Sequence, residues 1–171
     1  MLYLLDANVL INANNFYYPV DRVPEYWEWL LHMSQVGRIK MPLEIFEEVK
    51  DGPKDQEKDL LFSWIQKPES KAALILDEDI NIEALQSVIK LGYADNLTDD
   101  ESEQLGRDPF LIAYALRDQE RCVVTAEVSK PSFKRQNRKV PDVCKTLGVR
   151  WCDPFVLAKE LGFRTNWKNH I

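Results

Sequence analysis

Two acidic residues follow short apolar runs that have the composition of buried strands. Asp6 ends the run "LYLL", and Glu127 lies just beyond the run "CVVT". The carboxyl ends of parallel strands form the edge at which α/β proteins bind ligands, so both carboxylates are candidates for chemistry. Asp6 alone would serve equally well as the N-cap of a helix starting at Ala7. Because two separate strands each lead into an acid, we favour a functional interpretation of both.

The segment "MPLEIFEEVKDG" contributes a third acid. If it is helical, its apolar residues at positions 45, 46 and 49 share one side of the helix. Their mean direction lies about 107° from Glu48, but roughly 150° from Glu44 and Glu47. Glu48 is therefore expected to border the buried face, while the other two glutamates point outward. The alternative for Glu48 is a surface charge that merely flanks this face.

Two aspartates lie at expected helix starts. Asp108 precedes Pro109, which is a common pairing in the first turn of a helix. The same pairing recurs at Asp153 and Pro154, so it carries no functional signal by itself. Asp142 also lies near a helix start, where complementing the helix dipole is a sufficient explanation.

Taken together, the acids need a common explanation. Two carboxylates about 4 Å apart repel each other by roughly 4 kcal/mol at an effective dielectric constant of 20. A cluster of four would stay ionised only with bound cations, and hard oxygen ligands favour Mg²⁺ or Mn²⁺ over softer metals.

The elements that would position these residues alternate along the chain. Strands are predicted at residues 2–5, 38–41, 122–125 and 149–151, and helices at residues 7–14, 23–36, 42–52, 57–65, 82–91, 109–119, 141–147 and 154–161. Short apolar strands between helices predict an α/β fold with a central parallel sheet covered on both faces. The polar segments 51–57 and 95–103 are expected to be surface connections, and the second is long enough to form a lid over a cleft.

Composition limits the class of protein. A chain of 171 residues suits a single domain, 1–171, with a substantial core. The net charge of −6 argues against non-specific coating of nucleic acid, although two divalent ions would reduce it to −2. No apolar window approaches the roughly 18 residues of a membrane span, and a basic leader is absent, so we expect a cytoplasmic protein. Three cysteines without C-x-x-C spacing and two histidines favour neither a disulfide framework nor a zinc site.

Four segments resemble the PIN-domain ribonuclease superfamily: "LLDANVLI", "MPLEIFEEVKDG", "RDPFLIAYAL" and "VVTAE". More narrowly, "VVTAE" followed by "KVPDVCKTLGV" resembles a PIN-like family described as a domain of unknown function, whose members are similar to VapC-type toxins. The resemblance implies a PIN-like three-layer α/β/α fold and a metal-dependent endoribonuclease restrained by a protein antitoxin. Its catalytic and metal-binding positions are Asp6, Glu48, Asp108 and Glu127. Many members have Asp where Glu127 stands, and the longer side chain is expected to alter a second metal position.

The remaining polar residues have expected roles around this site. Asn8 and Thr125, with Asp142 as a further candidate, would orient the carboxylates by hydrogen bonds. A basic stretch beside Glu127 could bind the RNA backbone while Phe133 stacks on a base, and a solvated loop is the alternative. Its members are Lys130, Lys134, Arg135, Arg138 and Lys139.

Other interpretations stay open at this point. The aromatic segment "EYWEWLLHM" is expected to pack internally, although Tyr26 and Trp29 could instead contact an antitoxin or a second protomer of a homodimer. A non-catalytic or catalytically weak PIN-like binding module is the main functional alternative. A phosphotransfer fold fits less well, because the second Asp of such phosphatases would stand where Asn8 is found.

Overall fold

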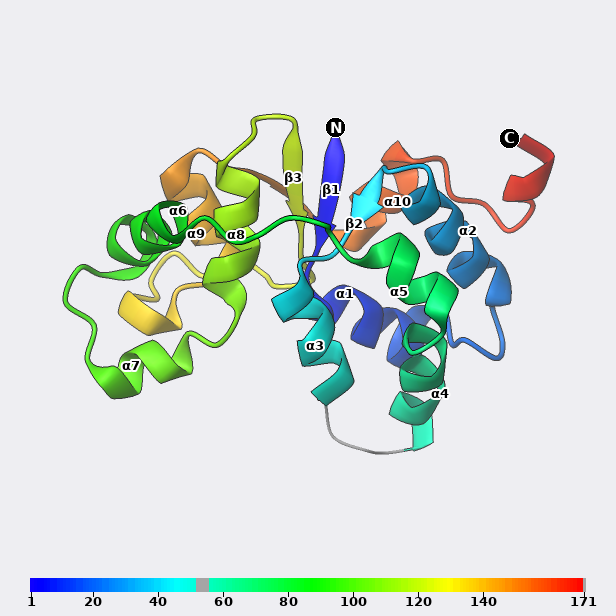
Figure 1. The fold of residues 1–171 in the computed structure, drawn as a ribbon, viewed down its shortest axis with the longest axis horizontal. Helices are drawn as coiled ribbons and strands as arrows, with labels where there is room; N and C mark the ends of the chain where they lie inside the picture. Colours follow the sequence, from blue (N-terminus) through cyan, green and yellow to red (C-terminus); the bar gives the residue numbers. More distant parts are fainter. Residues whose placement is uncertain (52–55, 171) are drawn as a thin grey trace.

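The computed structural model describes residues 1–51 and 56–170, and for residues 56–59 it describes the backbone only. Its centre is an all-parallel sheet of four strands in the order β2-β1-β3-β4. The strands are β1 (Leu2–Leu5), β2 (Ile39–Lys40), β3 (Arg121–Val124) and β4 (Arg150–Cys152). Helices flank the sheet in a three-layer α/β/α arrangement (Figure 1). The predicted fold class and all four strands are thereby confirmed.

The register of β1 and β3 brings their carboxyl ends together. Leu5 is paired with Val124, and the backbone N–H of Asp6 donates to the carbonyl oxygen of Val124 over 2.9 Å. Figure 1 shows β1 running from the N-terminus towards α1 and α3, the helices at this edge of the sheet. Whatever follows β1 and β3 therefore meets at one place.

All eight predicted helices form, with shifted ends. The α-helices are α1 (Ala7–Asn12), α2 (Pro24–Gln35), α3 (Leu43–Asp51), α4 (Gln56–Ile65), α5 (Pro68–Leu74), α6 (Ile82–Ser87), α7 (Asp99–Gln104), α8 (Asp108–Leu116), α9 (Val140–Leu147) and α10 (Pro154–Glu160). Two π-helical turns, η1 (Ala13–Tyr17) and η2 (Val88–Tyr93), continue α1 and α6, and two 3₁₀ turns are η3 (Arg135–Asn137) and η4 (Trp167–His170). Among the described residues, no helix is both long and apolar enough to cross a bilayer.

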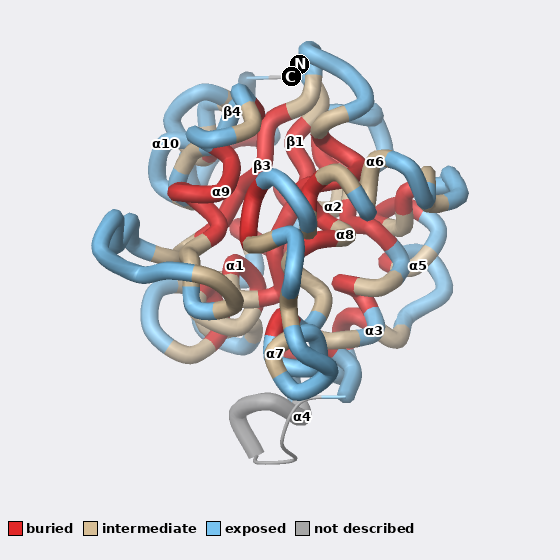
Figure 2. Tube along the Cα trace, turned by 90° about the vertical axis from the view of Figure 1, so that its left-hand side faces the viewer, coloured by how far each residue is buried: buried red, intermediate tan, exposed pale blue. Residues whose placement is uncertain are grey.

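The core lies on the sheet and the helices packed against it. Figure 2 shows the buried residues gathered on β1, β3 and the neighbouring helices, while α7 is largely exposed. The aromatic residues of α2 belong to this core: Tyr26, Trp27 and Trp29 are all buried, and the Trp27 indole donates to the carbonyl oxygen of Tyr18 over 2.7 Å. The internal-packing interpretation of this segment is correct, and Tyr26 and Trp29 do not form a surface for a partner.

Segment 95–103 lies at the surface as expected, but its residues from Asp99 onward form α7. Its start is a capping box: the Thr98 hydroxyl accepts from the backbone N–H of Glu101, and the Glu101 carboxylate accepts from that of Thr98. The residues "TDDE" provide hydrogen-bond partners for the free N–H groups at the start of α7. The helix has no apolar stripe, so hydrophobic periodicity does not predict it. Helix α5, with Pro68 in its first turn, was not predicted either. In segment 51–57, the expected helix end at Gly52 lies outside the described residues.

Gly92 provides a test of the packing between η2 and α9. A Cβ atom on Gly92 would lie 2.6 Å from Cγ1 of Val143, which is fully buried. We expect Gly92→Ala to lower the free energy of unfolding by about 1–3 kcal/mol, as overpacking of a stiff β-branched neighbour does. Urea denaturation measures this loss. Leu91→Ala, one residue away at a 63% exposed position, should change stability by less than about 0.5 kcal/mol. Equal stability of Gly92→Ala and the parent would contradict the close approach.

Candidate functional site

Asp6 occupies the N-cap position of α1 without acting as a cap. Its backbone is extended (φ −75°, ψ 152°), but its side chain accepts no capping hydrogen bond from the helix. Asp153, at the start of α10, shows the contrast: its carboxylate accepts from the backbone N–H groups of Phe155 and Val156, both over 2.8 Å. Asp6 is nevertheless 3% exposed. A buried carboxylate that does not cap its helix needs another explanation.

The side chains of Asn8 and Thr125 hold the Asp6 carboxylate. The Asn8 amide donates to Asp6 Oδ2 over 2.6 Å, and the Thr125 hydroxyl donates to the same oxygen over 2.7 Å. Asn8 also reaches the chain beyond β3, where its Oδ1 accepts from the backbone N–H of Ala126 over 2.8 Å. These contacts fix the carboxylate at the junction of β1 and β3, as residues surrounding a ligand set commonly do.

Glu48 lies on α3 with its side chain partly buried. Its Oε2 atom is buried without any hydrogen-bond partner among the described residues. A buried carboxylate oxygen without a partner is costly, and this atom is therefore free to accept a hydrogen bond or a cation. Glu47 is exposed as predicted.

Glu44 does not point outward as expected. It is half-buried, its Oε2 atom is also buried without a partner, and its Oε1 accepts from the hydroxyl of Tyr114 over 3.5 Å. The reason is that α3 packs against α8 as well as α1, so that a second neighbour covers a side that helical periodicity assigned to solvent.

Asp108 is the first residue of α8 and does not cap it. The N-cap residue is Arg107, and Pro109 follows within the first turn. The helix therefore begins one residue earlier than the sequence predicts and ends earlier, at Leu116. Asp108 is partly buried, so the Asp-Pro pairing does not account for its side chain.

The pKa values show that these carboxyl groups lie close to one another. Burial raises the pKa of Asp108 to about 8, with further increases from the charges of the other three acids and a decrease from Lys139. Burial likewise raises the pKa of Asp6 to about 6, against the opposing effect of the Thr125 hydrogen bond. The charges of Glu48 and Glu127 add to this increase for Asp6.

Burial also raises the pKa of Glu48, and the positive charge of Arg107 opposes this shift. The Arg107 guanidinium donates to the carbonyl oxygen of Glu44 over 2.8 Å and to Asp51 over 3.2 Å. It therefore ties both ends of α3 to the start of α8. Sequence reasoning overlooked this residue, although it stands directly before Asp108.

Tyr93 is a second residue that sequence reasoning missed. It is 8% exposed, and its hydroxyl group has no hydrogen-bond partner in the described chain. Burial raises its pKa first of all, and the charges of Asp108, Glu127 and Asp6 contribute further. The hydroxyl group thus lies within electrostatic reach of the acidic residues. The predicted helix stopped at residue 91, and no motif marks Tyr93.

Glu127 differs from the other three acids because both of its oxygens are occupied. Oε1 accepts from the Lys139 ammonium and Oε2 from the backbone N–H of Val140, each over 2.8 Å. Its own N–H donates to the hydroxyl of Thr125 over 3.1 Å, which ties it to the end of β3.

The donor set fits a hard divalent cation. All donors are carboxylate oxygens, one of them is buried without a partner, and their mutual repulsion would be relieved by positive charge. Within residues 1–51 and 56–170, no three His, Cys, Asp or Glu side chains are already arranged to hold an ion. Carboxylate rotamers would therefore have to converge on a bound cation.

Asp142 lies away from these contacts and holds the loop that follows Glu127. Its buried carboxylate accepts from the Ser129 hydroxyl over 2.5 Å and from the backbone N–H of Lys130 over 2.7 Å. It thus acts on the loop that carries the basic residues rather than on Asp6.

The basic stretch divides into two groups. Arg135 pairs with Glu101, and Arg138 donates to the hydroxyl of Thr146 over 2.7 Å. Together with Lys139, these side chains fasten the loop to the rest of the chain.

Lys130 and Lys134 are exposed, and the Lys130 ammonium lies 5.0 Å from the ring centroid of Phe133. A hollow of about 570 Å³ is lined by Glu101 and residues 132–137. This part of the loop is open to a ligand.

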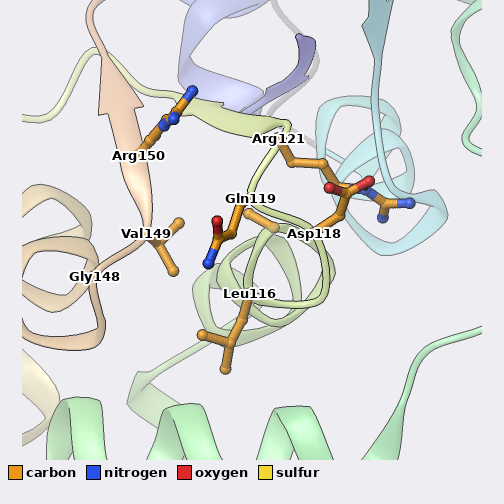
Figure 3. Close-up of a pocket in the computed structure, with 8 residues that line it drawn as sticks. Leu116, Asp118, Gln119, Arg121, Gly148, Val149 and Arg150 are labelled. Atoms are coloured by element: carbon orange, nitrogen blue, oxygen red, sulfur yellow. Dashed lines mark ion pairs between the residues drawn. The ribbon is translucent and has the colours of Figure 1, made fainter.

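A separate cavity of about 250 Å³ lies at the opposite end of the sheet, beside the first residues of β3 and β4 (Figure 3). Its lining residues are Ala115, Leu116, Asp118, Gln119, Arg121, Gly148, Val149 and Arg150. Arg121 is already paired with Glu78 over 2.6 Å. None of the four acids lines this cavity, so it is distinct from the acidic site.

Residues 3–165 match the model of a protein family described as Domain of unknown function (DUF4411). No curated protein and no solved structure matches the chain. The matched region includes all four acids of the candidate site.

The raised pKa values predict how stability depends on pH in the metal-free protein. Asp6 and Asp108 have folded-state pKa values above the usual 3.8, so the folded chain binds more protons than the unfolded chain between about pH 4 and pH 8. Stability should therefore fall as pH rises through this range, by about 1.4 kcal/mol per pH unit for each proton released on unfolding. Denaturation in EDTA at several pH values measures this slope.

Asp108→Asn should reduce the slope, because the amide carries no titrating proton. Asp21→Asn, at an exposed position, is the matched control and should leave the slope unchanged. An unaltered slope in Asp108→Asn would contradict the raised pKa of this residue.

Proposed function

The chain belongs to the DUF4411 family, and we propose that it is a PIN-like, Mg²⁺- or Mn²⁺-dependent endoribonuclease. The observation that carries the proposal is the set of partly or fully buried carboxylates at the carboxyl edge of the sheet, above all the buried, unpartnered Oε2 of Glu48. Neither Asp6 nor Asp108 caps its helix, so the structural explanation that suffices for Asp153 does not extend to them.

In this proposal Asp6, Glu48 and Asp108 hold the metal ion. When bound, a divalent ion supplies a water of lowered pKa and neutralises a phosphate oxygen, so that no nucleophilic side chain is needed. Asn8 and Thr125 keep the Asp6 carboxylate oriented through their hydrogen bonds to Oδ2. Glu127 completes the acidic site beside Lys139.

RNA would approach this acidic edge along the basic loop. The exposed ammonium groups of Lys130 and Lys134 attract the backbone, and Phe133, which is 40% exposed, offers a ring on which a base can stack. Restraint by a protein antitoxin and a cytoplasmic location belong to the same proposal. The antitoxin rests on the resemblance to VapC-type toxins, and a small open reading frame beside the gene would support it.

The alternative proposal is a catalytically weak PIN-like binding module. The observation in its favour is that both Glu127 oxygens are already engaged within the chain. Tight Mn²⁺ binding that depends on Asp6, without any RNA cleavage, would favour this alternative.

Substitution of the proposed ligands tests the nuclease. We expect Asp6→Asn and Glu48→Gln to lower the rate of RNA cleavage in Mg²⁺ or Mn²⁺ by more than about 100-fold, because each removes a charged ligand. Treatment with EDTA should abolish cleavage, and added Mn²⁺ should restore it. Glu47→Gln is the matched control, since it lies exposed on the same helix as Glu48 and should retain full activity. Variants of matched stability that cleave as well as the parent would refute the metal site.

Substrate binding by the loop has its own test. Lys134→Ala should weaken binding of single-stranded RNA and reduce the slope of log K against log salt by about 0.7, as expected for one lost phosphate contact. Fluorescence anisotropy between low and moderate salt in EDTA measures both effects. Lys159→Ala, at an exposed position on α10, should change neither. Equal salt slopes for Lys134→Ala and the parent would exclude this lysine from the RNA path.

A further inference from the structure

We infer that Lys139 is a built-in cation of the acidic site, so that the chain holds one divalent ion rather than two. The inference rests on the proposed function, because it concerns how the same carboxylates share positive charge. In this arrangement three acids hold the ion, and Glu127 holds the lysine.

The contacts of Glu127 carry the inference. Its Oε1 lies 2.8 Å from Lys139 Nζ, and its Oε2 lies 2.8 Å from the backbone nitrogen of Val140. Each oxygen therefore has a short hydrogen bond, and the first is assisted by opposite charges. A metal ion at Glu127 would have to displace one of these partners. Glu48, in contrast, has a buried oxygen with no hydrogen-bond partner in the described part of the chain.

The positive charge of the Lys139 ammonium group also influences Asp108. Burial raises the pKa of Asp108, and the Lys139 charge opposes this shift. The hydrogen bond to Glu127 raises the pKa of Lys139, and the charges of Glu127 and Asp108 add to that increase. Lys139 thus lies within electrostatic reach of a proposed metal ligand as well as of Glu127. A second divalent ion would meet this positive charge.

Both partners of Glu127 are anchored, which makes the pair a built feature rather than a chance surface contact. Lys139 is the N-cap residue of α9, and Val140 is its fully buried first residue, so one helix start presents the ammonium and the N–H together. Glu127 is tied to β3 through Thr125. The Lys139 and Glu127 side chains are only 32% and 21% exposed, and solvent screening of the pair is correspondingly limited.

Charge balance agrees with a single ion. Four ionised carboxylates carry −4, and one divalent ion with Lys139 supplies +3, which leaves the site at −1. Two divalent ions together with Lys139 would supply +5 and make it +1. The lysine also has three N–H donors, so it can contact a phosphate oxygen while one donor remains on Glu127.

Calorimetric titration of the full chain with Mn²⁺ distinguishes this arrangement from a purely structural ion pair. The parent should bind one ion, and Lys139→Met should bind two, because Glu127 then becomes available as a ligand. Lys139→Arg retains the charge and should return the stoichiometry to one. Lys145→Met is the matched control, since it removes an exposed lysine from α9 and should also bind one.

A pair that only fastens the loop predicts a different result: Lys139→Met would melt at a lower temperature and still bind one ion. That result would overturn the inference, as would two ions bound by the parent. Absence of Mn²⁺ binding by the parent and every variant would instead defeat the proposed function, and the inference with it.

Glu127→Gln provides a second variant should Lys139→Met fail to fold. The inference expects this variant to retain its one ion, because Glu127 is not a ligand. Loss of that ion, in a variant with the parent's circular dichroism spectrum, would overturn the inference without affecting the nuclease proposal.

Discussion

The parallel pairing of β1 with β3 is the constraint on which the site depends. It places Leu5 opposite Val124, so that the first residues beyond each strand meet at one edge of the sheet. Asn8 then bridges the two chain segments, with its amide on Asp6 and its carbonyl oxygen on the Ala126 N–H. A shift of one residue in this register would turn the strand side chains to the opposite faces and separate these groups. The packing of the core and the position of the Asp6 carboxylate therefore both depend on this register.

The same packing brings the acidic residues together at the carboxyl edge of the sheet, where their negative charges repel one another. Leu4, Leu5 and Val124, at the ends of the strands that lead to Asp6 and Glu127, are fully buried, and the burial of Asp6 limits solvent screening of its repulsion with the other acids. The raised pKa values of Asp6 and Asp108 express this cost. A fold selected for stability alone would place such carboxylates in solvent or pair each with a base. Retaining them together is typical of functional sites, where shifted pKa values gather.

Sequence patterns predict the strands and helices of this protein better than the contacts of individual side chains. The strand Leu2–Leu5 is predicted to the residue because a continuous apolar run is bounded by Asp6. Helical periodicity ranks Glu48 correctly against the exposed Glu47, yet it fails for Glu44, since a one-sided pattern does not reveal that α8 also covers α3. Tyr93 approaches the acids only through tertiary packing, and the pairing of Glu127 with Lys139 spans a loop with no regular pattern.

Glu127 connects the end of β3 with the basic loop. A glutamate has one methylene more than an aspartate, so its carboxylate extends farther from the end of β3. In this chain that carboxylate reaches the start of α9, where Lys139 and the Val140 N–H both donate to it. Glu127 and the basic loop are thus structurally linked, because the glutamate side chain is long enough to reach Lys139 at the end of the loop. Part of the positive charge that balances these carboxylates is therefore carried by the chain itself.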